Sequence, residues 1–180
     1  MFDKIREECG VFGIFDPVIS NVARSTYLAL YAIQHRGQES CGIAVNEDGV
    51  FRSHRAAGLV PEVFDAETLE KLGKGNMAVG HVRYLPAKNF SIDEIQPLVV
   101  HHVKGSMAIA YNGNIMNASQ LRRQYELEGA IFHGESDSEV IAYAITKARL
   151  QTDTIEEAVE KAMTVLQGAF SIVIMTSQEL

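Results

Sequence analysis

The sequence is poor in the features that mark several classes of protein. Its 180 residues include only two cysteines, Cys9 and Cys41, which is too few for a disulfide-stabilised scaffold. No apolar run approaches the ~20 residues that a helix needs to cross a bilayer. The first eight residues, MFDKIREE, are too charged to form the apolar centre of a secretion signal. We therefore expect neither a membrane partner nor a secreted protein.

Basic residues and metal-ligand spacings are also scarce. The 16 Lys and Arg stand against 23 Asp and Glu, a net charge of −7, and they form no basic stripe, which argues against nucleic acid as a partner. The six histidines show no metal-ligand spacing, and the adjacent His101 and His102 would point to opposite faces of a strand. We therefore expect no metal site.

What remains is the composition of an ordinary globular protein. Hydrophobic residues make up 47% of the chain and charged residues 22%, which rules out long disorder. At ~150 residues per domain, 180 residues correspond to about one domain with one core. The sequence predicts a soluble, cytoplasmic protein of one domain.

Hairpins dominate the local pattern. Asp48-Gly49 separates two β-rich runs, 42–45 and 50–54, and Lys104-Gly105 separates 98–103 from 106–111. Further strands are predicted at 10–15, closed by Asp16-Pro17, at 77–84 and at 169–175, and Asn112-Gly113-Asn114 is expected to form a tight turn. Since hairpins join neighbouring strands, the pattern predicts an α+β fold with largely antiparallel sheets covered by helices.

Capping residues mark the expected helices. Ser20 and Asn117 are candidate N-caps, Asp65 opens a short helix to Leu72, and Gly129 ends the helix that follows Asn117. Ser136-x-x-Glu139 and Thr154-x-x-Glu157 are capping boxes. The predicted helices are 21–35, 65–72, 117–129, 137–150 and 155–167.

Cys9 is the sharpest candidate for chemistry. It stands at the start of a predicted strand, and the eight residues before it match no core pattern. A thiol with a free pKa of ~8.5 needs a base to act as a nucleophile at neutral pH, and an α-amino group with a pKa of ~7.7–8 could serve if Cys9 were the N-terminus. The alternative is a buried cysteine at a strand edge, and Cys41 is expected to be a core residue of that kind.

Three further positions suit the binding of an α-amino acid and the stabilisation of negative charge. Arg83 ends a predicted strand and suits a carboxylate, while Asp137 begins a predicted helix and suits an ammonium group. Asn112-Gly113 could form an oxyanion hole from the Asn amide and the Gly N–H. Each has a simpler interpretation, a solvated surface charge or a turn.

Five segments together resemble one family. CGVFGIF at 9–15, QHRGQESCGIAV at 34–45, GHVRY at 80–84, YNGNI at 111–115 and SDSEV at 136–140 occur in one fixed order. They are similar to the N-terminal glutaminase domain of the glutamine phosphoribosylpyrophosphate amidotransferases, which are class II glutamine amidotransferases of the N-terminal nucleophile (Ntn) hydrolase superfamily. The resemblance runs from Glu8 to about Met175.

The resemblance implies a fold and a role for each site residue. The fold would be a four-layer α/β/β/α sandwich of two antiparallel sheets, with residues 1–8 a leader removed to expose Cys9 as nucleophile. Asn112 and Gly113 would form the oxyanion hole, Arg83 would bind the glutamine carboxylate and Asp137 its ammonium group. Arg36, in QHRGQ, would brace the nucleophile.

The resemblance also implies cofactors, partners and departures. Residues 9–180 would be a glutaminase domain truncated at its C-terminal end, without the phosphoribosyltransferase domain that receives ammonia and uses magnesium. No cofactor is expected in this domain, and the full-length enzyme would be a homo-oligomer. After Arg83 the sequence YLPAKNF departs from the family's YSTAG-like pattern, with Pro86 and Lys88 in a loop that normally flexes over glutamine.

Three functions follow from these observations. The leading one is glutamine hydrolysis that supplies ammonia for phosphoribosylamine formation in purine biosynthesis. The departure at 85–88 supports an alternative, a glutaminase-like module that binds or regulates without turning over glutamine. The glutaminase part of another ammonia-channelling amidotransferase is a third, which the QHRGQES segment disfavours.

Overall fold

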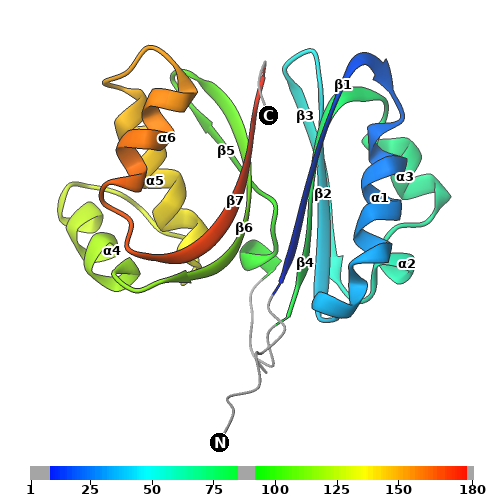
Figure 1. Ribbon diagram of the computed structural model, residues 1–180, viewed down its shortest axis with the longest axis horizontal. Helices are drawn as coiled ribbons and strands as arrows, with labels where there is room; N and C mark the ends of the chain where they lie inside the picture. Colours follow the sequence, from blue (N-terminus) through cyan, green and yellow to red (C-terminus); the bar gives the residue numbers. More distant parts are fainter. Residues whose placement is uncertain (1–8, 85–91, 178–180) are drawn as a thin grey trace, which may run out of the picture.

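A computed structural model describes residues 9–84 and 92–177. The expected leader 1–8 and the divergent segment 85–88 lie outside the described residues. Figure 1 shows four layers, in which two sheets face each other and each carries helices on its outer side. This confirms the predicted α+β sandwich of two antiparallel sheets.

The first sheet has four strands in the order β1-β4-β2-β3, all antiparallel. The strands are β1 (Gly10–Ser20), β2 (Ser40–Glu47), β3 (Val50–Ala57) and β4 (Gly75–Arg83). The predicted hairpin at Asp48-Gly49 joins β2 to β3, and both residues have positive φ. The helices α1 (Val22–Ala32), α2 (Val60–Val63) and α3 (Ala66–Leu72), together with the 3₁₀ turn η1 (Gln34–Arg36), belong to this half.

The second sheet has three strands in the order β5-β6-β7, also antiparallel. The strands are β5 (Leu98–His102), β6 (Gly105–Ile115) and β7 (Gly168–Thr176), and the 3₁₀ turn η2 (Ile92–Glu94) precedes β5. Its outer face is covered by α4 (Ala118–Leu127), α5 (Asp137–Arg149) and α6 (Ile155–Met163). No helix in the described part of the chain is long and apolar enough to cross a membrane.

The core divides into layers as strand alternation requires. Along β4, Ala78 and Val82 face α1, whereas Met77 and Val79 face the other sheet. Between the sheets, alanines and a valine pack against two methionines, which fill the space between the layers. These residues are Ala44, Met77, Val79, Ala108, Ala110 and Met175. Cys41 is fully buried, as predicted for a core residue.

Two predictions about strand ends are wrong. β1 continues past Asp16-Pro17 to Ser20, because an edge strand tolerates a proline that donates no hydrogen bond. Asn112-Gly113-Asn114 forms no turn, because β6 runs on to Ile115 and pairs with β7 at every one of these positions. The pairing with β7 therefore overrides the local preference of the Asn-Gly-Asn motif for a turn.

Most helix predictions are right in place and wrong in detail. Asp65 and Thr154 cap their helices as predicted. Asn21, not Ser20, caps α1, and the Asn117 side chain bonds to Val165 and Gln167 instead of capping α4. The helices α1 and α6 are shorter than predicted, and α2 was not predicted.

Candidate active site

The candidate site lies at the end of the molecule where β1 begins and β4 ends. In Figure 1 these two strand ends and η2 meet the lower part of β6 between the sheets. The register Gly10↔Val82 and Val11↔His81 places Cys9, one residue earlier, at the level of Arg83. Two of the predicted site residues are thus brought together by strand pairing.

Cys9 is half-buried and held through its backbone. Arg36 donates from Nε to the Cys9 carbonyl oxygen at 3.2 Å, and the Cys9 thiol lies 3.9 Å from the Tyr84 carbonyl oxygen. Arg36 ends η1, and this short 3₁₀ turn directs its side chain toward the start of β1. This contact joins the Arg36 side chain to the backbone just before β1, and the bracing role of Arg36 stays a prediction.

Arg83 is buried, with 9% of its surface exposed, so it is no solvated surface charge. It occupies the inter-sheet face of β4, in alternation with Val79 and His81. Its Nη2 lies 3.3 Å from a Glu94 carboxylate oxygen, and its Nη1 donates to the Glu94 carbonyl oxygen at 3.2 Å. A buried charge of this kind requires such a partner.

Asn112 and Gly113 lie on β6 near the same end of the molecule. Asn112 takes the inter-sheet face, following Ala108 and Ala110, and its Oδ1 is buried without a hydrogen-bond partner. Gly113 has a φ of +140°, and a Cβ there would lie 2.3 Å from the Ala169 carbonyl oxygen. Only glycine fits this position without strain.

Asp137 begins α5, as predicted, and faces β6. One of its carboxylate oxygens lies 3.2 Å from the Tyr111 hydroxyl oxygen and accepts from the Ile115 N–H at 3.4 Å. The Tyr111 hydroxyl also lies 2.6 Å from the Gly113 carbonyl oxygen, to which it donates. Tyr111 therefore links the predicted ammonium ligand to the predicted oxyanion strand.

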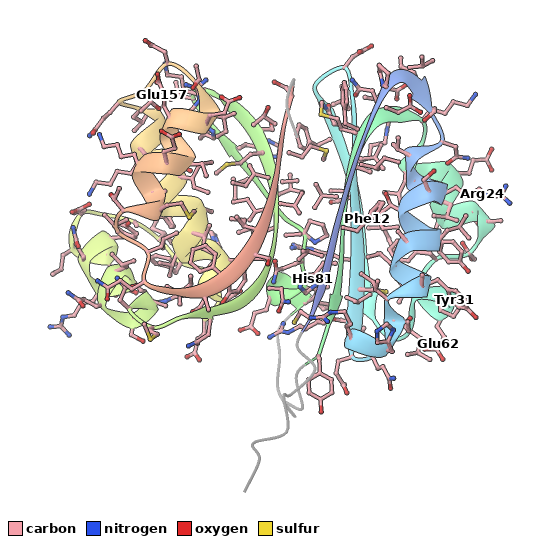
Figure 2. The ribbon with its side chains drawn as sticks, viewed as in Figure 1. Phe12, Arg24, Tyr31, Glu62, His81 and Glu157 are labelled. Carbon is pink, nitrogen blue, oxygen red and sulfur yellow. The ribbon has the colours of Figure 1, made fainter. Side chains whose placement is uncertain are left out.

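A polar bridge between the sheets supports β6 at Tyr111. The Gln96 side chain accepts from the Tyr111 N–H at 2.6 Å and donates to the Tyr111 carbonyl oxygen at 3.1 Å. Because β5 begins only at Leu98, this side-chain amide makes the hydrogen bonds that a neighbouring strand would make. The same carbonyl oxygen lies 3.1 Å from His81 Nε2, which must donate because a carbonyl can only accept. Figure 2 shows His81 between the sheets.

Burial determines the charge of His81. The side chain is fully buried, and desolvation lowers its pKa to about 3, while the Tyr111 carbonyl raises the pKa and the Arg83 charge lowers it further. His81 is therefore neutral at pH 7, and its Nδ1 has no hydrogen-bond partner. A neutral imidazole here adds no second positive charge beside Arg83.

Hydrogen bonds and strand register connect the predicted residues in two groups. Cys9, Arg36 and Arg83 meet where β1, η1 and β4 come together, and Gly113 and Asp137 meet through Tyr111. Sequence reasoning missed the residues that join the groups, Glu94, Gln96 and His81. The alternation 77, 79, 81, 83 offered a signal for His81, because it places a histidine among inward positions of a strand.

A separate groove of about 480 Å³ lies between β5 and α5. Its lining includes Arg55, His101, His133, Glu139 and Tyr143, and none of the predicted site residues. In residues 9–84 and 92–177, no three His, Cys, Asp or Glu side chains are grouped to hold a metal ion. The site at the strand ends presents a thiol, guanidinium groups and amides.

Comparison with known proteins relates the chain to one group of enzymes. The sequence profile of the family described as "Glutamine amidotransferase domain" matches residues 87–180. The amidophosphoribosyltransferase of Staphylococcus aureus strain MRSA252 is 39% identical over 179 residues, which cover 99% of this chain and 35% of that protein. The amidophosphoribosyltransferase of Methanocaldococcus jannaschii is 41% identical over 172 residues, covering 96% and 36%.

Solved structures give the same relationship. A structure described as the allosteric regulatory enzyme of purine biosynthesis matches with a TM-score of 0.85 and 39% identity, over 93% of this chain and 35% of that one. Glutamine phosphoribosylpyrophosphate amidotransferase from B. subtilis, complexed with ADP and GMP, matches with a TM-score of 0.81 and 38% identity over the same shares. The chain spans about a third of the length of the curated relatives that it matches.

Proposed function

This chain belongs to the glutamine amidotransferase domain family, with the Ntn hydrolase fold, and on that premise we propose that it hydrolyses glutamine to glutamate and ammonia. The observation that carries the proposal is the placement of Cys9 beside the buried Arg83, at the strand ends that also meet η2 and β6. A nucleophile and a carboxylate ligand at the same end of the sheets suit the two ends of one small substrate.

The proposed nucleophile is the Cys9 thiol, activated by its own α-amino group once residues 1–8 are removed. The amine takes the thiol proton, and the thiolate attacks the side-chain amide carbon of glutamine. The protonated amine then passes its proton to the leaving nitrogen, which departs as ammonia and leaves a thioester. Water attacks the thioester, glutamate leaves, and the thiol is regenerated. Arg36 holds the Cys9 carbonyl throughout.

Asn112 and Gly113 are the proposed donors to the oxyanion of both tetrahedral intermediates. In an antiparallel ladder the N–H groups of successive residues point to alternate sides. Tyr111 bonds to Gln96 on the β5 side, so Gly113, two residues on, presents its N–H to that same side. The buried, unpaired Oδ1 of Asn112 supports a functional role for its amide, because buried polar atoms without partners are rare.

Arg83 and Asp137 are the proposed ligands of the substrate's α-carboxylate and ammonium groups. Arg83 presents a buried guanidinium, which favours a carboxylate over water. Asp137 presents a carboxylate that Tyr111 and Ile115 orient at the start of α5. This pair would select an α-amino acid among primary amides.

The relatives suggest where the ammonia goes. Proteins named amidophosphoribosyltransferase extend well beyond the region that matches this chain. We therefore propose that the domain works with a phosphoribosyltransferase domain, in a cytoplasmic homo-oligomer that makes phosphoribosylamine for purine biosynthesis. Magnesium would be needed by that domain only.

The test is the replacement C9S in protein that begins at residue 9. The hydroxyl is almost isosteric with the thiol, so the fold should persist, but its alkoxide is far harder to form. We expect glutamate release to fall to the background rate while the thermal unfolding transition stays in place. C41S serves as a matched control, because Cys41 is buried and its pKa is raised by burial to about 12.

Two outcomes would change the proposal. Unchanged turnover in C9S would exclude Cys9 as nucleophile. A parent protein that folds and binds glutamine without hydrolysing it would favour the non-catalytic module that the divergent segment 85–88 suggests.

A further inference from the structure

Glu94 is a largely buried carboxylate, and none of the sequence motifs predicted a role for it. It ends η2, its side chain is 17% exposed, and its partner Arg83 has a side chain 11% exposed. Glu94 binds both terminal nitrogens of that guanidinium, one through its carboxylate and the other through its backbone carbonyl. Two acceptors on one residue fix the plane of the guanidinium as well as its position.

The second carboxylate oxygen of Glu94 faces another element. It lies 3.4 Å from the Glu135 N–H, and the Glu94 side chain packs against Gly134. Gly134 and Glu135 lie immediately before α5, whose first residue is Asp137. One carboxylate thus connects the residue proposed to bind the substrate carboxylate to the segment that carries the residue proposed to bind its ammonium group.

This geometry indicates that Glu94 supports Arg83 and does not take the place of the substrate carboxylate. A carboxylate that imitated the substrate would place both of its oxygens on the guanidinium fork. Glu94 places only one there, gives the other to a backbone N–H, and supplies the second contact from its own backbone.

We propose that Glu94 is a positioning residue for glutamine recognition, which orients Arg83 toward the α-carboxylate of the substrate. The proposal rests on the function proposed above and adds to it the residue that holds the carboxylate ligand in place. Because the contacts of Glu94 are with Arg83 and with the backbone before α5, we expect its effect to be on substrate binding.

The experiment measures glutamate release against glutamine concentration in protein that begins at Cys9. E94Q keeps an acceptor oxygen and loses the charge, whereas E94D keeps the charge on a side chain one methylene shorter. We expect E94Q to raise KM by about 10-fold or more with kcat within about 3-fold of the parent, as for lost uniform binding. E94D should restore part of the loss.

A neighbouring carboxylate provides the control. E135Q removes the same negative charge from an exposed side chain, and the Glu135 contact with Glu94 uses only the backbone N–H. This variant should keep the KM of the parent. In an R83A background, E94Q should add little to the loss of kcat/KM, because the two residues act through one contact.

The possible outcomes distinguish failure of this inference from failure of the proposed function. An unchanged KM in E94Q would overturn the positioning role, and a lower KM would show that Glu94 competes with substrate. A fall in kcat together with a rise in KM, with no rescue in E94D, would show that Glu94 has only a structural role. A parent without glutaminase activity would overturn the proposed function and this inference with it.

Discussion

His81 makes the stability of the protein depend on pH. The neutral imidazole donates to the Tyr111 carbonyl between the sheets, and burial lowers its pKa from 6.5 to about 3. In the unfolded chain the same side chain takes up a proton below pH ~6.5, whereas in the folded protein it does not. The unfolded state therefore binds more protons in this range, and stability falls as the pH falls from 6.5 toward 3.

The predicted effect is measurable near neutral pH, where carboxylates scarcely titrate. Between pH 7 and pH 5.5 the free energy of unfolding should decrease by about 1 kcal/mol on account of His81, at ~1.4 kcal/mol per pH unit below the unfolded pKa. H81Q can still donate to Tyr111 and should show a flatter dependence from a lower starting stability. Urea denaturation at the two pH values tests this, and equal decreases in both proteins would contradict it.

At the scale of single residues, motifs could predict the candidate site residues but not the residues that position them. Cys9, Arg83 and Asp137 stand in segments that resemble a family, and their places at a strand start, a strand end and a helix start are confirmed. Glu94 and Gln96 act on Arg83 and Tyr111, 11 and 15 residues away along the chain. No local period or spacing reports such contacts, because an irregular segment outside any hairpin makes them.

At the scale of elements, paired strands were predictable and their ends were not. Both Gly-containing hairpins occur where Asp48-Gly49 and Lys104-Gly105 predicted them, since turn chemistry is local. The extent of β6 was mistaken because nine pairs with β7 outweigh the turn preference at Asn112-Gly113. That same extension carries Asn112 and Gly113 past the start of β5, so that no residue of β5 pairs with Gly113 on the side to which its N–H points.

Two glycines lie on opposite faces of the first sheet, Gly42 on β2 and Gly80 on β4, and substitutions there test how this sheet supports the site. Gly42 faces the other sheet, and a Cβ there would lie 2.2 Å from the Gln96 carbonyl oxygen. Gly80 faces α1, and its Cβ would lie 2.6 Å from a Thr26 methyl carbon. Both substitutions to alanine should destabilise the fold by ~1–3 kcal/mol through overpacking.

Their effects on activity should differ. G42A displaces the segment that carries Glu94 and Gln96, so kcat/KM for glutamine should fall by about 10- to 100-fold, as small misplacements near a site do. G80A disturbs only the packing of α1 and should keep kcat/KM within about 3-fold of the parent. Kinetics at a temperature where both proteins are folded test this. Equal losses in the two variants would mean that stability alone determines activity.

At the scale of the whole molecule, the site lies where the apolar contact between the sheets ends. The middle of that contact is filled by Met77, Val79 and Met175, whereas toward the strand ends β4 presents His81 and Arg83 instead. The four-layer arrangement therefore shields the polar end of the contact between the sheets on both sides, and the start of β1 lies at the opening of that end. The proposed activity depends on the chain beginning there, at Cys9.

The last prediction concerns that beginning. With Glu8 attached, the Cys9 nitrogen is an amide whose lone pair is delocalised and accepts no proton, whereas a free α-amino group has a pKa of ~7.7–8. Protein that begins at Cys9 should release glutamate at pH ~8, and protein that begins at Met1 should not. A third form that begins at Glu8 adds one residue only, and it should be equally inactive if the missing amine is the cause. Intact mass verifies each N-terminus. Activity in the Glu8 form but not in the Met1 form would assign the inhibition to occlusion by the leader, and equal activity in all three would exclude the amine as base.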